Sequence, residues 1–198
     1  MRRLWGALLI LLIVCQGVHA ESKDPNYPED PNELIRIKWR AVISVLRNKQ
    51  IDPNEKQTKI NKIVSPIFDF PLMAKLALGR ENWPKLTAAQ QKKFTELFVG
   101  RIKTSYREKI ALYTDEKVEF KPAVRKKQII HVPAELISKD KKIQVLHKLH
   151  KVDKRWKVFD VEIQGVSILL TYRSQFDDIL RRGTVEELLS RLEKPPAE

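Results

Sequence analysis

The feature that most constrains the fold is the stretch WKVFDVEIQGVSILLTYRSQF, residues 156–176, in which a strand pattern changes abruptly into a helix pattern. Its first half alternates apolar and polar residues, which predicts a strand with Phe159, Val161 and Ile163 on one face. Gly165 interrupts the alternation, and the apolar residues beyond it recur at three- and four-residue steps, as in an amphipathic helix. We therefore expect a sheet and helices to meet here around a shared apolar interior.

The remainder of the chain predicts helices first, then strands, then helices again. Helices are expected to begin near Asp30, Asp52, Phe68–Pro71, Thr87, Ser167 and Thr184, where capping residues or prolines precede an apolar stripe. Between them the apolar period changes to two in four runs, residues 118–124, 130–136, 143–149 and 156–163. Because short charged turns join these runs, they predict an antiparallel meander. The expected fold class is α+β, a four-stranded antiparallel sheet packed against several helices.

The first twenty residues have the pattern of a secretory signal peptide. Two arginines precede an apolar run over residues 4–14, and the small residue Ala20 stands directly before Glu21. The apolar run is shorter than a membrane-spanning helix requires. We expect residues 1–20 to be removed on export and residues 21–198 to form a single domain. An uncleaved N-terminal anchor is the alternative.

Charge and cysteine content limit the possible partners and chemistry. The formal net charge is +13, or +11 after loss of the two arginines in the first twenty residues. This charge favours anionic partners such as lipid headgroups, nucleic acid or an acidic protein surface, and export argues against nucleic acid. The only cysteine, Cys15, lies within the expected signal peptide. A mature chain without it has no disulfide, thiol nucleophile or thiolate metal site.

Catalytic motifs are lacking in the sequence. After the leader it contains three histidines, and His147 and His150 would point to opposite faces of a strand, which is a poor arrangement for a metal pair. An isomerase-like pocket with Asp160 as its base is an alternative. We favour a structural role for Asp160, paired with a nearby cation such as Arg173. We therefore predict no enzymatic activity, no metal and no cofactor.

Two segments resemble the MlaC family of periplasmic phospholipid-binding proteins of the maintenance-of-lipid-asymmetry system, also described as toluene-tolerance or ABC-transporter auxiliary proteins. The first is ALGRENWPKLTAAQQ, residues 77–91, and the second is GVSILLTYRSQF, residues 165–176. The similarity extends over about residues 34–192.

The resemblance implies an NTF2-like or MlaC-like fold, in which a curved sheet and helices enclose an apolar cavity for acyl chains. It also implies a periplasmic carrier without enzymatic activity that moves phospholipid between two membranes. Its partners would be an inner-membrane complex of an ABC transporter with an MCE-domain ring, and an outer-membrane lipoprotein complex.

The candidate site residues are those whose apolar periodicity would place them between sheet and helices. The candidates for the walls of an acyl-chain cavity are Leu76, Phe94, Phe98, Ile102, Tyr106, Val145, Leu149, Val161, Ile163, Ile168, Leu169, Tyr172 and Phe176. Periodicity does not separate cavity wall from packed core. Arg80, Lys103 and Arg173 are candidates for a headgroup site at the mouth, because cationic side chains attract phosphate. A small-molecule isomerase or hydrolase in the same pocket, or an adaptor without a ligand, are the alternative functions.

Overall fold

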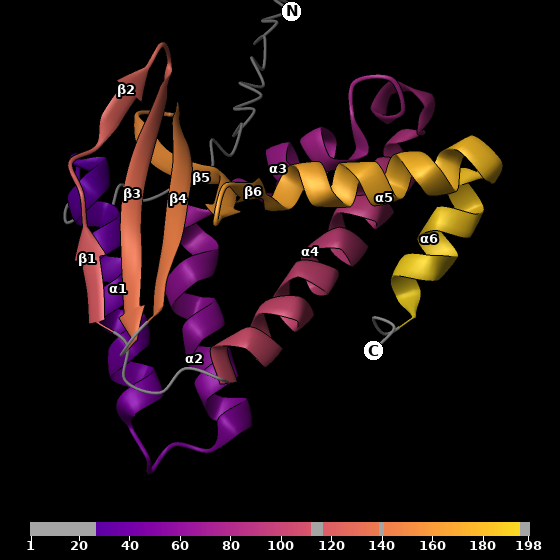
Figure 1. Ribbon diagram of the computed structural model, residues 1–198. Coiled ribbons are helices and arrows are strands. Elements are labelled where there is room, and N and C mark those ends of the chain that lie inside the picture. Colours follow the sequence, from indigo (N-terminus) through magenta and orange to yellow (C-terminus); the bar gives the residue numbers. More distant parts are fainter. Residues whose placement is uncertain (1–26, 112–116, 139–140, 195–198) are drawn as a thin grey trace, which may run out of the picture.

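The computed structural model describes residues 27–111, 117–138 and 141–194 (Figure 1). Its helices are α1 (Pro31–Arg47), α2 (Pro53–Val64), α3 (Phe70–Leu78), α4 (Ala88–Ala111), α5 (Ile168–Arg182) and α6 (Val185–Glu193). Short 3₁₀ helices, η1 (Ser65–Ile67) and η2 (Trp83–Lys85), precede α3 and α4. The strands are β1 (Lys117–Phe120), β2 (Val124–Lys126), β3 (Ile129–Ser138), β4 (Lys141–Val152), β5 (Arg155–Ile163) and β6 (Val166–Ser167). The predicted α+β class is confirmed.

Local capping chemistry determines where the helices begin, as the sequence predicted. The capping residues are Asp30, Asp52, Asp69, Thr87, Ser167 and Thr184. Each side chain accepts a hydrogen bond from an N–H group of the first turn that has no partner within the helix. Helix α3 ends at Gly79, whose φ of +86° lies in the region that favours glycine. The apolar pattern of the sequence predicts that the helix begun at Thr87 ends near Tyr113, which falls outside the described residues; α4 is described to Ala111.

The sheet is antiparallel, with strand order β1-β3-β4-β5-β6 and with β2 also paired to β3. It has six strands where four were expected. The first expected strand is divided into β1 and β2 at Pro122, and the two-residue β6 adds an edge beyond β5. Neither Pro122 nor Pro133 on the facing strand can donate a backbone hydrogen bond, so the ladder is interrupted there.

Two tight turns determine the register of the strands around β5. Asp153 and Lys154 join β4 to β5, and Gln164 and Gly165 join β5 to β6, all four with positive φ. Two consecutive positive φ values are typical of the two-residue hairpin turn whose twist matches that of the flanking strands. Gly165 therefore ends β5 through a hairpin, and α5 begins directly after β6.

The expected side-chain alternation along β5 is wrong because the strand contains a β-bulge. Lys148 is opposite Asp160 and Leu149 is opposite Val158, so Phe159 is the additional residue on β5. Beyond the bulge the alternation is reversed. Val158 and Val161 consequently pack in one cluster, whereas Phe159 packs in another.

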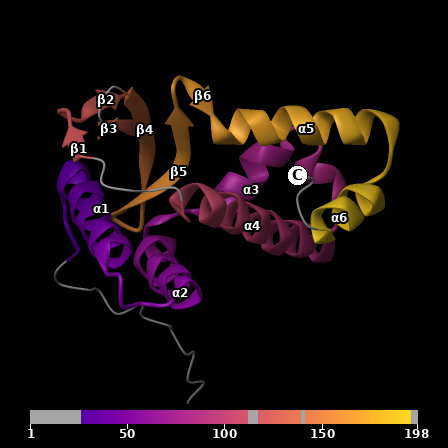
Figure 2. The same cartoon turned by 60° about the horizontal axis from the view of Figure 1, so that its bottom comes forward.

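The buried apolar side chains form two clusters. The helical cluster comprises Met73, Ala74, Ala77, Leu78, Leu86, Phe94, Phe98, Ile102, Leu169, Phe176, Leu188, Leu189 and Leu192. The sheet cluster comprises Leu34, Ile35, Ile67, Ile130, Val132, Val145, Leu149, Trp156, Val158 and Val161. In the ribbon, α1 and α2 lie against the sheet, while α3 to α6 form a second group of helices beside it (Figure 2). Within the described residues, no helix is both long and apolar enough to cross a membrane.

Candidate functional site

The two clusters meet where the chain between α2 and α3 runs beside β5. The N–H group of Asp69 donates to the carbonyl of Val158 at 2.9 Å, which ties the start of α3 to the middle of the strand. Phe68 packs against both clusters, and its ring stacks on that of Phe70 with centroids 5.6 Å apart. Phe159, directed to this side by the bulge, packs against the helical cluster. These aromatic side chains lie at the junction of sheet and helices.

The first turns of α5 reach both clusters. Ile168 is partly buried against the sheet cluster, whereas Leu169 is buried within the helical cluster and Tyr172 is partly buried against it. Ile168 and Tyr172 are four residues apart and therefore share one face of the helix. That face therefore bridges the sheet cluster and the helical cluster. Both side chains are apolar except for the Tyr172 hydroxyl.

The structure divides the predicted cavity residues between the two clusters. Phe94, Phe98, Ile102, Leu169 and Phe176 are buried in the helical cluster, with Leu76 and Tyr172 packed against it. Val145, Leu149 and Val161 are buried in the sheet cluster, with Ile163 and Ile168 packed against it. The side chain of Tyr106 lies outside the described part of the chain. The partly buried residues are the ones best placed to contact a ligand, because fully buried rings are already surrounded by protein.

The aromatic residues of the helical cluster form a close-packed set. Phe94 and Phe98 are fully buried, and each ring meets that of Phe176 edge to face at centroid distances of 5.4 and 6.0 Å. Tyr172 meets Phe98 in the same manner at 5.2 Å. The Tyr172 hydroxyl lies 3.3 Å from Ser105 Oγ, so its polar atom has a partner.

The three predicted headgroup cations do not form one group. Lys103 places its Nζ atom 5.5 Å from the centre of the Phe70 ring, close to the junction of the clusters. Arg173 pairs with Asp177 at 3.8 Å, and its side chain lies over Gly79. Arg80 is exposed and makes no hydrogen bond or ion pair within the described residues. Of the three candidates, Lys103 is therefore the one that lies beside the apolar junction.

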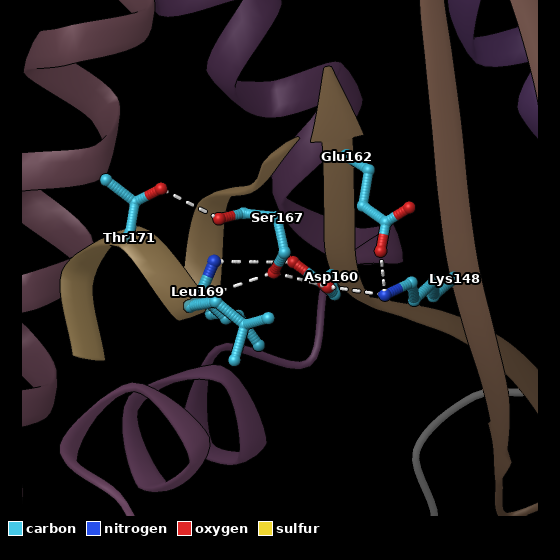
Figure 3. Close-up of polar contacts among 7 residues, drawn as sticks. Lys148, Asp160, Glu162, Ser167, Leu169 and Thr171 are labelled. Carbon is cyan, nitrogen blue, oxygen red and sulfur yellow. Dashed lines mark hydrogen bonds and ion pairs between the residues drawn. The ribbon is translucent and has the colours of Figure 1, made fainter. Parts of the chain in front are cut away.

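Asp160 anchors the strand-to-helix junction (Figure 3). It is 4% exposed, and it accepts hydrogen bonds from Ser167 Oγ at 2.8 Å and Lys148 Nζ at 3.1 Å. The N–H group of Leu169 donates to its other oxygen at 3.4 Å. Asp160 pairs with a nearby cation as expected, but that cation is Lys148 and not Arg173, which lies over Gly79 and pairs with Asp177. The carboxylate holds β4, β5 and the start of α5 together.

Lys148 completes this anchor by pairing with both Asp160 and Glu162. Burial lowers the pKa of Lys148, but hydrogen bonds to Glu162 and Asp160 outweigh burial, so the pKa is raised above its ordinary value. The lysine is therefore charged and compensates the buried carboxylate.

His147 and His150, which the sequence predicts to be a poor metal pair, each have a different hydrogen-bond partner. Trp39 Nε1–H donates to His147 Nε2 at 3.2 Å, and His147 Nδ1–H therefore donates to the carbonyl of Val132, also at 3.2 Å. Burial lowers the pKa of His147 to about 4. His150 Nε2 lies 2.8 Å from a carboxylate oxygen of Asp69, beside the junction of the two clusters.

Sequence reasoning missed the contribution of Phe68, Phe70 and Asp69 to this junction. The available signal was the Phe-Asp-Phe-Pro segment, in which two rings flank a capping carboxylate. Its pairing with β5 links residues about ninety positions apart, as the bridge between Phe68 and Val158 shows. Across the described ranges, no three His, Cys, Asp or Glu side chains are grouped to hold a metal ion. The arrangement suits contact with apolar groups beside a few partnered polar atoms.

Comparison with known proteins agrees with this architecture. One similar solved structure is a phospholipid-binding protein from Ralstonia solanacearum in complex with a phospholipid, with a TM-score of 0.74 and 22% sequence identity. The alignment covers 83% of this chain and 95% of that one. No curated protein sequence matches this chain. The model of the family described as MlaC protein matches residues 38–194, which is most of the chain, and the protein therefore belongs to the MlaC family.

Proposed function

We propose that this protein is a periplasmic carrier that binds the acyl chains of a phospholipid between its sheet cluster and its helical cluster. The observation that carries the proposal is the face of α5 on which Ile168 contacts one cluster and Tyr172 the other, both only partly buried. Membership of the MlaC family and the phospholipid complex of the Ralstonia solanacearum protein support it. The ligand would enter by separating side chains along this junction.

Energetics explain why such a carrier is useful. Two acyl chains of about fourteen methylenes each, at about 0.8 kcal/mol per methylene, would make bare transfer through water cost on the order of 20 kcal/mol. An apolar site must offset most of this free energy and still release the lipid to a membrane. Shape-tolerant apolar walls with few fixed polar contacts satisfy both needs. Lys103, whose Nζ atom lies 5.5 Å from the centre of the Phe70 ring, would attract an anionic headgroup.

The same proposal covers location and partners. Residues 1–20 would act as a cleaved signal peptide and residues 21–198 as one lipid-binding domain. The protein would exchange lipid with an inner-membrane complex of an ABC transporter and MCE-domain ring, and with an outer-membrane lipoprotein complex. Its similarity to the MlaC family supports these partners.

Native mass spectrometry with lipid extraction tests the proposal on protein purified gently from a Gram-negative host. We expect the wild type to carry phospholipid and Ile168→Asn to carry much less, because the substitution places an amide at the junction. Leu170→Asn is the matched control, since Leu170 is on the same helix turn but 62% exposed. A wild type free of lipid, or equal lipid loss in both variants, would contradict the proposal.

A further inference from the structure

A recess lies between α1 and β1, the strand at the other end of the sheet from β5 and β6. It is an open groove of about 640 Å³. Helix α1 contributes residues from Arg36 to Arg47, three turns of the helix, and β1 contributes Lys117, Val118 and Phe120. The lipid proposal uses none of these residues.

The groove is lined by cations on both sides. Arg36, Arg40 and Arg47 line it from α1 and Lys117 from β1, and no carboxylate is among its lining residues. The guanidinium of Arg36 lies 5.5 Å from the centre of the Phe120 ring. Its Nε atom has no hydrogen-bond acceptor in the described residues, but it lies 3.6 Å from a carboxylate oxygen of Glu33, three residues earlier in α1. Arg40 is exposed and has no ion pair within the described residues, whereas Lys117 pairs with Glu119 on its own strand. Exposed ion pairs of this kind contribute little, so the groove, with four lining cations against these two carboxylates, still attracts an anionic ligand.

The floor of the groove is apolar and held in place. Trp39, Ile43, Val118 and Phe120 provide its apolar surface, all partly buried. The indole of Trp39 is fixed by its hydrogen bond to His147, which is itself bonded to Val132 in the sheet. The groove therefore offers a rigid apolar surface between charged rims, as protein-binding surfaces commonly do.

The strand that forms one wall is at an edge of the sheet. Among the described residues, β1 pairs with β3 on one side and with no strand on the other. An edge strand presents backbone groups that an extended chain can pair with, in the manner of strand addition. A chain lying along this edge would also pass beside the arginines of α1.

We propose that the groove between α1 and β1 binds an extended segment of a partner protein in which carboxylates alternate with apolar side chains. The carboxylates would pair with Arg40 and compete for Arg36 and Arg47, which already interact with other groups, and the apolar side chains would cover Trp39 and Phe120. A concave groove beside a strand edge fits a single chain better than it fits a flat membrane surface. The inference rests on the proposed carrier function only in that a carrier must be recognised by the proteins that load and unload it.

Selection from a random peptide library tests this site on the purified full-length protein. Wild type is the target, and the double variant Arg40→Glu with Arg47→Glu is used for counter-selection. We expect enrichment of peptides with alternating acidic and apolar residues. Their affinity should fall at least about tenfold in the double variant and decrease with added salt. Lys92→Glu, at an exposed position on α4, is the control and should bind like the wild type.

Two further measurements make the outcome decisive. Hydrogen exchange with an enriched peptide bound should protect the amides of residues 117–120, as strand addition requires. Enrichment of non-acidic peptides, no enrichment, or binding that the double variant leaves unchanged would overturn the proposal. Binding of wild type and double variant to anionic vesicles gives one more contrary outcome. If the double substitution weakens vesicle binding and leaves peptide binding unchanged, the groove recognises a membrane and the proposal is wrong. Lipid content of the same preparations, by native mass spectrometry, reports separately on the carrier function.

Discussion

At the scale of single residues, the polar side chains buried in this protein are structural anchors. Asp160 accepts three hydrogen bonds, from Ser167, Lys148 and the N–H group of Leu169, and it has almost no exposed surface. A general base must reach a proton on a substrate. The geometry around Asp160 therefore favours a role in holding α5 to the sheet over a role in catalysis.

Asp160→Asn should destabilise the protein by about 2 kcal/mol, because Lys148 loses the buried one of its two carboxylate partners. Urea denaturation at neutral pH measures the change. Asp178→Asn is the control: its carboxylate pairs with Arg181 on the surface and should change stability by less than about 0.5 kcal/mol. Equal effects of the two substitutions would show that Asp160 is not an anchor.

His147 should make stability depend on pH. Its pKa is about 4 in the folded protein and 6.5 as its ordinary value, so the unfolded chain binds the proton first as pH falls. The stabilisation is present above pH 6.5 and is lost as pH falls to 4. The total loss corresponds to about 3 kcal/mol. Denaturation at pH 7 and at pH 4.5 should show a smaller loss for His147→Gln than for the wild type, and parallel losses would contradict this.

At the scale of elements, irregular positions decide how the helices and strands are joined. The bulge at Phe159 reverses the faces of β5, and Gly79 ends α3 where the Arg173 side chain crosses it. A Cβ atom on Gly79 would lie 3.1 Å from Arg173 Nε, in addition to the strain of a positive φ. Both features let α3, β5 and α5 pack closely.

Gly79→Ala should therefore destabilise the protein by about 1–2 kcal/mol. Gly100→Ala provides the matched comparison, since a Cβ there meets no atom within 4 Å and the residue lies inside α4. This second substitution should stabilise the protein by about 0.5–1 kcal/mol through helix propensity. Thermal and urea unfolding of both variants measure the changes, and shifts of the same sign would contradict the interpretation of Gly79.

At the scale of the whole molecule, the sheet cluster and the helical cluster meet along one junction. Polar side chains beside it, such as Asp160 and Tyr172, have hydrogen-bond partners within the protein. If phospholipid occupies this junction, removing it should expose apolar surface and withdraw the stabilisation that a bound ligand provides. The delipidated protein should then unfold at a Tm lower by about 5 °C or more and should bind a hydrophobic dye. Adding phospholipid back should reverse both changes, and an unchanged Tm would indicate that lipid does not fill the structure.

Much of this architecture is determined locally and could be predicted from the sequence. N-capping residues such as Asp52 and Ser167, and the break in the strand pattern at Gly165, act through neighbours a few residues away, so their effect is visible in the chain itself. The apolar periods of two and of three to four gave the class of each main element for the same reason.

Only the tertiary structure decided which faces meet. The bulge at Phe159 depends on the register of β4, the partner of Asp160 is Lys148 on a neighbouring strand, and Phe68 reaches β5 from a segment about ninety residues earlier. These contacts arise from pairing between distant segments, which a local pattern does not encode. The separation of the candidate residues into two clusters was hidden for that reason, because periodicity places a side chain on a face but does not say what covers that face.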